Sequence, residues 1–313
     1  MTPLSEFGRV VGTPASIVAE SPIWDEATQR LYWVDIIGKA VFRHDPETAR
    51  TERWQTEDFP TAIALCEGGP HDAVLALAGG VVFFDFGTGR TTPFCQPESV
   101  PGNRLNEGRC DPGGRLWLGS MQTNLNPDGS GREMDRNSGA LFRVDGDGSI
   151  SRHSEHEFGI SNTMAWSPDL KTFYFGDSIR NVIFAYDYDA DGGTLSNRRP
   201  LLQDYPRGVP DGSAIDADGC LWNARFGGAC LIRITPKGKV DREISLPVSN
   251  PTSCTFGGTG RRRLYVCSAT FTLDEAQLQA NPLEGTMLSA EATVPGLSDH
   301  RFKPAQHLVN SHQ

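Results

Sequence analysis

The chain has 313 residues, of which 38% are hydrophobic and 22% charged, and its formal net charge is −10. This composition is typical of a globular protein and excludes a disordered chain. The acidic balance, with no basic run, predicts neither nucleic acid nor a membrane surface as partner. The N-terminus has no signal-peptide pattern and no stretch approaches ~18 apolar residues, so we expect a cytoplasmic protein.

The cysteines are scattered and never form a Cys-x-x-Cys pair. Most of them stand beside apolar residues in strand-like runs, which predicts buried free thiols in a reducing compartment. A disulfide framework or a thiolate zinc site is not indicated. The seven positions are Cys66, Cys95, Cys110, Cys220, Cys230, Cys254 and Cys267.

A turn followed by an apolar strand recurs six times along the chain. Examples are "WDEATQRLYWVDI", "CDPGGRLWLGSM" and "IDADGCLWNARFGG". Successive units lie 41 to 56 residues apart, which leaves room in each for about four short strands. The turn residues of the six units are Asp25, Glu67, Asp111, Ser167, Asp216 and Gly257.

Repeats of this length predict an all-β fold, a single six-bladed β-propeller domain over residues 1–313 with a metal site in its central channel. Closing the ring removes the exposed sheet edges of a linear array. A seven-bladed WD40-type ring would place a Trp-Asp pair at the end of each unit, and that signature is missing. Two β-sandwiches are disfavoured because no Pro/Ser-rich linker divides the chain.

The metal site is predicted from the position five residues before each turn residue. The innermost strand of each blade lines the channel, so equivalent positions form a ring around one mouth. Such a ring of oxygens suits a hard divalent cation. The competing interpretation is that these residues are ordinary turn residues. The six positions hold Glu20, Ala62, Asn106, Asn162, Asp211 and Thr252, and all but Ala62 and Thr252 carry a side-chain carbonyl or carboxylate.

Five ordered segments resemble the SMP-30/gluconolactonase/regucalcin family. They are "AESPIWDEATQRLYWVDI", "GNRLNEGRCDPGGRLWLGSM", "GISNTMAWSPDLKTFYFGDS", "PDGSAIDADGCLW" and "NPTSCTFGG", spread from about residue 18 to residue 268. The resemblance implies a six-bladed propeller with one divalent metal in the channel. It also implies hydrolysis of a sugar lactone.

The resemblance carries over to individual positions. It implies that Glu20, Asn162 and Asp211 are the metal ligands, and that Arg104 and Asn106 bind the substrate. Ca²⁺ is the expected ion, with Zn²⁺, Mn²⁺, Mg²⁺ and Fe²⁺ as alternatives.

The chain departs from the family pattern at three positions. Thr163 follows the ligand Asn162 where glycine is usual, and Glu107 replaces an aspartate. Asn124 stands where some members have a substrate-contacting acid, so we expect it to bind the substrate too. These departures leave the sugar specificity open.

The implied parts suggest a mechanism. A channel metal polarises the lactone carbonyl, Asp211 takes a proton from the attacking water, and Arg104 offers fixed donors to hydroxyls or to the oxyanion. We therefore expect a monomer or weak homo-oligomer that converts a small sugar lactone to its aldonic acid. Asp216, as a turn residue, is expected to matter little. The alternatives are a metal-dependent arylester or organophosphate hydrolase on the same scaffold, and a calcium-binding propeller without catalysis.

Overall fold

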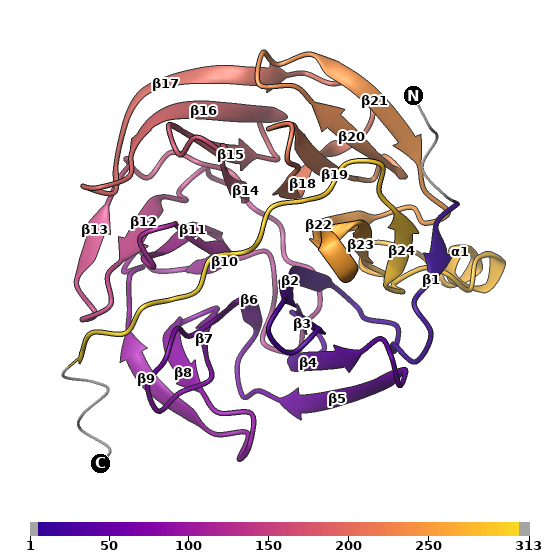
Figure 1. Ribbon diagram of the computed structural model, residues 1–313, viewed down its shortest axis with the longest axis horizontal. Coiled ribbons are helices and arrows are strands. Elements are labelled where there is room, and N and C mark those ends of the chain that lie inside the picture. The colour runs from indigo at the N-terminus through magenta and orange to yellow at the C-terminus, as the bar shows by residue number, and fades with distance from the viewer. Residues whose placement is uncertain (1–5, 307–313) are drawn as a thin grey trace.

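The first strand of every repeat lies innermost in the computed structural model, which describes residues 6–306 (Figure 1). Each innermost strand contacts the innermost strands of the neighbouring sheets, so the six surround a common channel. They are β2 (Ala19–Asp25), β6 (Pro60–Leu65), β10 (Asn103–Cys110), β14 (Ser161–Trp166), β18 (Val209–Ile215) and β22 (Pro251–Gly257). The predicted all-β six-bladed propeller is confirmed.

Five of the six blades add three further strands outward in chain order. Blade 1 has β3 (Arg30–Asp35), β4 (Ala40–Asp45) and β5 (Arg50–Gln55), and blade 2 has β7 (Ala73–Leu77), β8 (Gly80–Phe84) and β9 (Thr91–Cys95). Blade 3 has β11 (Leu116–Gln122), β12 (Leu141–Val144) and β13 (Ile150–Arg152). Blade 4 has β15 (Thr172–Asp177), β16 (Val182–Asp189) and β17 (Thr194–Gln203), and blade 5 has β19 (Leu221–Phe226), β20 (Cys230–Ile234) and β21 (Val240–Ser245).

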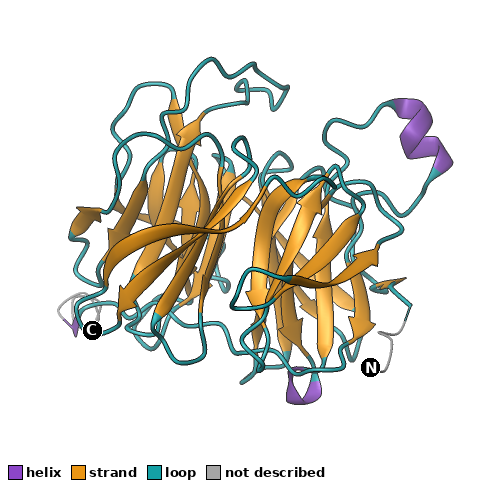
Figure 2. Cartoon of the chain, turned by 90° about the horizontal axis from the view of Figure 1, so that it is seen from above, coloured by secondary structure: helices purple, strands orange, loops and turns teal. Residues whose placement is uncertain are grey.

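Blade 6 joins the two ends of the described chain. After β22 it contains β23 (Arg263–Ser268) and β24 (Leu288–Glu291), and its outermost strand is the N-terminal β1 (Gly8–Arg9), which pairs antiparallel with β24. This shared sheet closes the ring without leaving an open edge between first and last blades. The loop from β23 to β24 carries a short exposed helix, α1 (Glu275–Ala280), and a 3₁₀ turn, Thr259–Arg261, links β22 to β23. Figure 2 shows α1 and this turn on opposite faces of the ring.

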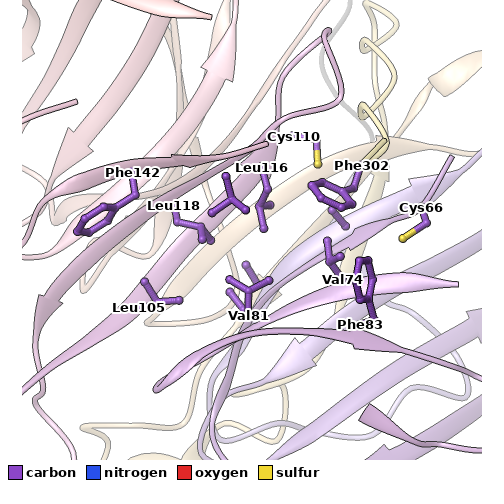
Figure 3. Close-up of a cluster of buried hydrophobic side chains, with 14 of the residues drawn as sticks. Cys66, Val74, Val81, Phe83, Leu105, Cys110, Leu116, Leu118, Phe142 and Phe302 are labelled. Atoms are coloured by element: carbon purple, nitrogen blue, oxygen red, sulfur yellow. The ribbon is translucent and has the colours of Figure 1, made fainter. Parts of the chain in front are cut away.

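Burial falls from the channel outward. The innermost β14 and β2 are buried along their whole length, whereas most residues of the outer β17 are exposed. Apolar side chains of adjacent blades fill the space between the sheets. Figure 3 shows one such cluster between blades 2 and 3, with Leu105 and Leu118 at one end and Phe83 beside Val74 at the other. Burial of this apolar surface is the main favourable contribution to the fold.

Residues 292–305, here called the C-terminal strap, cross the ends of the innermost strands on the opposite side from α1 (Figure 1, yellow). The strap forms bridges to the base of two blades, Asp216 with Gly296 and Cys66 with Phe302. The Phe302 ring is fully buried in the cluster of Figure 3. Because the strap covers this base, the channel has its open mouth at the other end.

Two turn aspartates are buried anchors of their blades. Asp216 accepts hydrogen bonds from Trp222 Nε1 at 2.8 Å and from Arg233 Nε at 2.7 Å. Asp111 accepts from Trp117 Nε1 at 2.9 Å in the same way, six residues along the chain. Both carboxylates are 0% exposed. Asp216 lies in a turn as the repeat predicts, and its carboxylate in addition neutralises a buried arginine and satisfies a buried indole.

The cysteine prediction is confirmed. All seven thiols are free, and every one is buried except Cys95, which is half-buried. Burial raises the pKa of Cys66 to about 12, so this thiol stays protonated and unreactive at neutral pH. No helix among residues 6–306 is long and apolar enough to cross a membrane.

Candidate active site

The predicted ring residues meet at the open mouth of the channel. Glu20 of β2, Asn106 of β10, Asn162 of β14 and Asp211 of β18 all line one cavity of about 270 Å³. Thr252 of β22, the sixth position, also lines it, whereas Ala62 of β6 does not. The repeat register therefore brings together residues that are more than 40 positions apart in sequence.

Each innermost strand has a β-bulge or similar irregularity at the ring position. The pairing of β2 shifts between Glu20 and Ile23, that of β14 shifts between Asn162 and Met164, and the other four innermost strands are irregular at the equivalent place. Bulges re-aim side chains next to active sites. Here they turn the polar residues into the channel while the rest of each strand keeps its regular pairing. Periodicity alone did not predict them.

Thr163 explains how the chain tolerates a departure from the family pattern. Its φ of 52° lies in the left-handed region that a β-branched residue rarely adopts. Its hydroxyl donates to the backbone oxygen of Asp211 at 2.5 Å and accepts from Asn223 Nδ2 at 3.1 Å. These bonds offset the backbone strain and tie blade 4 to the backbone that carries Asp211.

The carboxylates of Glu20 and Asp211 are 9% and 6% exposed and face each other. Burial is the main cause that raises the pKa of Glu20, followed by repulsion from Asp211 and then from Glu107. Burial and then Glu107 raise the pKa of Asp211. Among the described residues, neither carboxylate forms an ion pair with an Arg, Lys or His. Two buried carboxylates that repel each other without a directly paired cation are costly, and a cation bound between them would remove that cost.

Asn162 is oriented so that its oxygen is available. Its Nδ2 donates to Ser178 Oγ at 2.9 Å, which fixes the amide and leaves Oδ1 with only a long 3.4 Å contact to Asn106 Nδ2. Asn106 differs, because its Oδ1 already accepts a hydrogen bond from Arg104 Nη1 at 2.7 Å. The Asn162 oxygen is therefore more available to a cation than the Asn106 oxygen.

Arg104 is held by two amides instead of a carboxylate. Nη1 donates to Asn106, and Nη2 donates to Asn124 Oδ1 at 2.9 Å, while Nε has no acceptor among residues 6–306. Burial lowers the pKa of Arg104 to about 10, which still leaves it charged at neutral pH. Asn124 lies on the loop after β11, so the fold brings together all three predicted substrate-binding residues.

Glu107 does not line the cavity. Its Oε1 accepts from its neighbour Gly108 N at 2.9 Å, and burial raises its pKa although Arg109 and that hydrogen bond lower it. Its charge contributes to the raised pKa of both Glu20 and Asp211. Glu107 is therefore an electrostatic neighbour of the site.

The rest of the cavity wall was not foreseen. Besides the ring position Thr252, the hydroxyls of Ser178 and Thr272 line the cavity, and the remaining unpredicted residues are apolar. No sequence signal identifies them, because they come from strand ends and loops outside the repeat register. The apolar lining residues are Val18, Ile36, Ile37, Met121, Leu125, Ile160, Val209, Phe226 and Phe271.

These features define a six-bladed propeller with a polar site at one mouth of its channel. The chain belongs to the SMP-30/gluconolactonase/LRE-like family, whose model matches residues 18–270. It is 36% identical over 271 residues to regucalcin of Xenopus laevis, covering 86% of this chain and 88% of that protein.

Two further comparisons extend over almost the whole chain. The 6-deoxy-6-sulfogluconolactonase of Pseudomonas putida is 32% identical over 303 residues, which cover 96% of this chain and 99% of the relative. The crystal structure of regucalcin from Agrobacterium tumefaciens, described as a calcium-binding protein, superposes with a TM-score of 0.86 at 27% identity, covering 95% and 98% of the two chains. The family thus includes sugar lactonases.

Proposed function

We propose that this protein hydrolyses a sugar lactone to the corresponding aldonic acid with the help of one divalent cation. The observation that carries the proposal is the pair of buried carboxylates, Glu20 and Asp211, that share a cavity with the Arg104 guanidinium. A lactone is a cyclic ester, so its hydrolysis needs an activated water and a stabilised oxyanion.

The donor set fits a divalent cation. Glu20 and Asp211 form no ion pair among the described residues, and the Asn162 Oδ1 beside them has only a long 3.4 Å contact with Asn106. Oxygen donors of this kind are those that Ca²⁺ and other hard cations prefer. A bound divalent cation polarises a carbonyl and makes a coordinated water more acidic. Glu20, Asn162 and Asp211 would hold it, and Ca²⁺ is our first candidate.

The chain's own residues supply the remaining steps. Asp211 is positioned to accept the proton of the attacking water, which requires a carboxylate within hydrogen-bond reach. Arg104, kept in place by Asn106 and Asn124, is positioned to donate to the carbonyl oxygen of the lactone as negative charge develops on it. Because the guanidinium is already oriented, little side-chain entropy is lost when the substrate binds.

A calcium-binding role without catalysis is the second candidate, favoured by the description of the Agrobacterium relative as a calcium-binding protein. Both functions require the cation, so cation binding alone does not separate them. An arylester or organophosphate hydrolase on the same scaffold would show phosphotriester or aryl acetate turnover in place of aldonolactone turnover.

The experiment is a panel of aldonolactones followed with a pH indicator, using chelated protein to which Ca²⁺, Mn²⁺, Mg²⁺, Zn²⁺ and Fe²⁺ are added back one at a time. We expect no turnover without metal and recovery with at least one ion. Full turnover by chelated protein would overturn the metal dependence. Cation binding with no turnover of any ester would overturn the enzyme assignment and support the binding protein.

A further inference from the structure

Most hydrogen-bond donors on the cavity floor are already engaged within the protein. Ser178 Oγ donates to the backbone oxygen of Pro210 at 2.6 Å, and Thr252 Oγ1 donates to that of Ala19 at 2.5 Å. Asn106 Nδ2 donates to the Ser161 oxygen at 2.9 Å. These polar side chains shape the floor, but their donors are not available to a substrate.

Few donors remain for a ligand. Among the residues that the structure describes, the Asn124 amide nitrogen has no acceptor, and Arg104 uses three of its five N–H groups. Thr272 Oγ1, at the mouth, accepts from Asn250 Nδ2 at 3.2 Å and keeps its own O–H free. This set can serve an ester group and the hydroxyl next to it.

The upper wall of the same cavity is apolar and comes from several blades. Ile37 follows β3, Phe226 ends β19, and Phe271 follows β23, and all three are half-buried. Phe226 belongs to none of the interior clusters that hold the blades together. An apolar side chain that lines a cavity without supporting the core points to an apolar part of the ligand.

We propose that the substrate is a lactone whose end remote from the ester is apolar, a deoxy or alkyl substituent in place of a hydroxyl-bearing chain. This inference rests on the proposed lactonase function. A hydroxyl placed against Ile37, Phe226 and Phe271 would lose its water without gaining a partner, whereas a methyl group there is favoured by burial. The polar floor then binds the ester and the apolar wall selects the substituent.

The test uses lactone pairs that differ only in the terminal hydroxyl. These are L-galactono-γ-lactone against L-fucono-γ-lactone, and L-mannono-γ-lactone against L-rhamnono-γ-lactone, with both pairs repeated in the D series. The protein is loaded with the cation that restores activity, and kcat/KM is measured with a pH indicator. We expect the deoxy member to be preferred by about 10- to 100-fold, the ratio that one unsatisfied buried hydroxyl produces.

Equal turnover within the pairs, or preference for the hydroxylated members, would overturn the apolar substrate while leaving the lactonase function standing. No turnover of any lactone by the loaded protein would overturn the lactonase function, and the inference with it. The two failures are therefore distinguishable.

Substitutions in the apolar wall test whether this wall causes the preference for deoxy lactones. Phe226→Tyr adds one hydroxyl to the wall at nearly constant size and is expected to reduce the deoxy preference several-fold through the KM of the hydroxylated lactones. Phe94→Tyr is the matched control, because Phe94 is a half-buried phenylalanine of β9 that packs on Phe83 and Phe302 away from the mouth. An unchanged ratio in Phe226→Tyr, with the melting temperature preserved, would overturn the role of this wall.

Discussion

Two aspartates, Asp211 near the start of β18 and Asp216 directly after its end, have opposite environments. Asp216, at the base, accepts hydrogen bonds from Trp222, from Arg233 and from the Cys220 backbone. Asp211, at the mouth, is nearly as buried, yet it faces Glu20 and Glu107 and its pKa is raised. A carboxylate surrounded by donors stabilises the fold, whereas one left among other carboxylates is held at a cost. That cost is characteristic of a functional site.

Strand β2 repeats the contrast. Its mouth residue Glu20 has a raised pKa, while Asp25 at the base accepts from Thr28 Oγ1 at 2.6 Å and pairs with Arg301 of the C-terminal strap. Blades 1 and 5, the two neighbours of blade 6, therefore each have a hydrogen-bonded aspartate at the base and, within the described part of the chain, an unpaired carboxylate at the mouth. The base aspartates stabilise the fold through hydrogen bonds and ion pairs, whereas the mouth carboxylates Glu20 and Asp211 form no ion pair within residues 6–306.

The comparison predicts that Asp211→Asn gives the largest loss of activity. The amide keeps the size and one oxygen but cannot take a proton, so the hydrolysis rate is expected to fall by roughly 10²–10⁴-fold. The melting temperature of the metal-free protein should not fall, because a repulsive charge is removed. Rate, metal content and melting temperature are measured together. The control is Asp187→Asn, which alters an exposed pair with Arg199.

Asp216→Asn is expected to act in the reverse way. It removes the charge that neutralises Arg233, so the free energy of unfolding should fall by roughly 2–4 kcal/mol, while turnover per folded molecule stays near normal. Urea unfolding measures the loss. Asp218→Asn is the matched control, because Asp218 pairs with the same arginine but is 61% exposed, and we expect its loss to stay below about 1 kcal/mol. Equal losses in both variants would contradict the anchor role.

Thr163→Val tests the link between blade 4 and the Asp211 backbone. Loss of the 2.5 Å hydrogen bond should loosen the position of Asp211 and reduce kcat by roughly 10-fold, within the range that small misplacements produce. Thr163→Ser keeps the hydroxyl and should retain most of the rate. If both variants lose activity equally, the hydroxyl is not what positions Asp211.

The smallest expected effect concerns the pH dependence of stability at the outer edge of blade 3, where His153 directly follows β13. His153 packs on Trp117 with ring centroids 4.6 Å apart, and burial, then repulsion from Arg143, lowers its pKa to about 4. The pKa of this histidine is lower in the folded protein than its unfolded value of about 6.5, so the folded state binds fewer protons. The contribution of His153 to the free energy of unfolding is therefore lost as the pH falls from about 6.5 towards 4. His153→Leu should flatten the stability profile in that window. An unchanged slope in urea titrations would contradict this.

The sequence by itself determined the propeller and the position of the polar oxygens that line its channel mouth. The spacing of the turn residues predicts six blades, and the same register places Glu20, Asn162 and Asp211 around one mouth. This succeeds because a propeller repeats one local unit, so a fixed offset from each turn marks the same depth in the channel.

Only the tertiary structure decided what each carboxylate does. Asp211 and Asp216 both lie in turn-like sequence, and their difference depends on Arg233, Trp222 and Glu20, which other strands bring to them. The same holds for the Arg104 contact with Asn124, the wall around Phe226 and the C-terminal strap. The physical reason is that burial, pKa and hydrogen-bond satisfaction depend on neighbours that are distant in sequence. Local periodicity does not predict which of these residues come into contact.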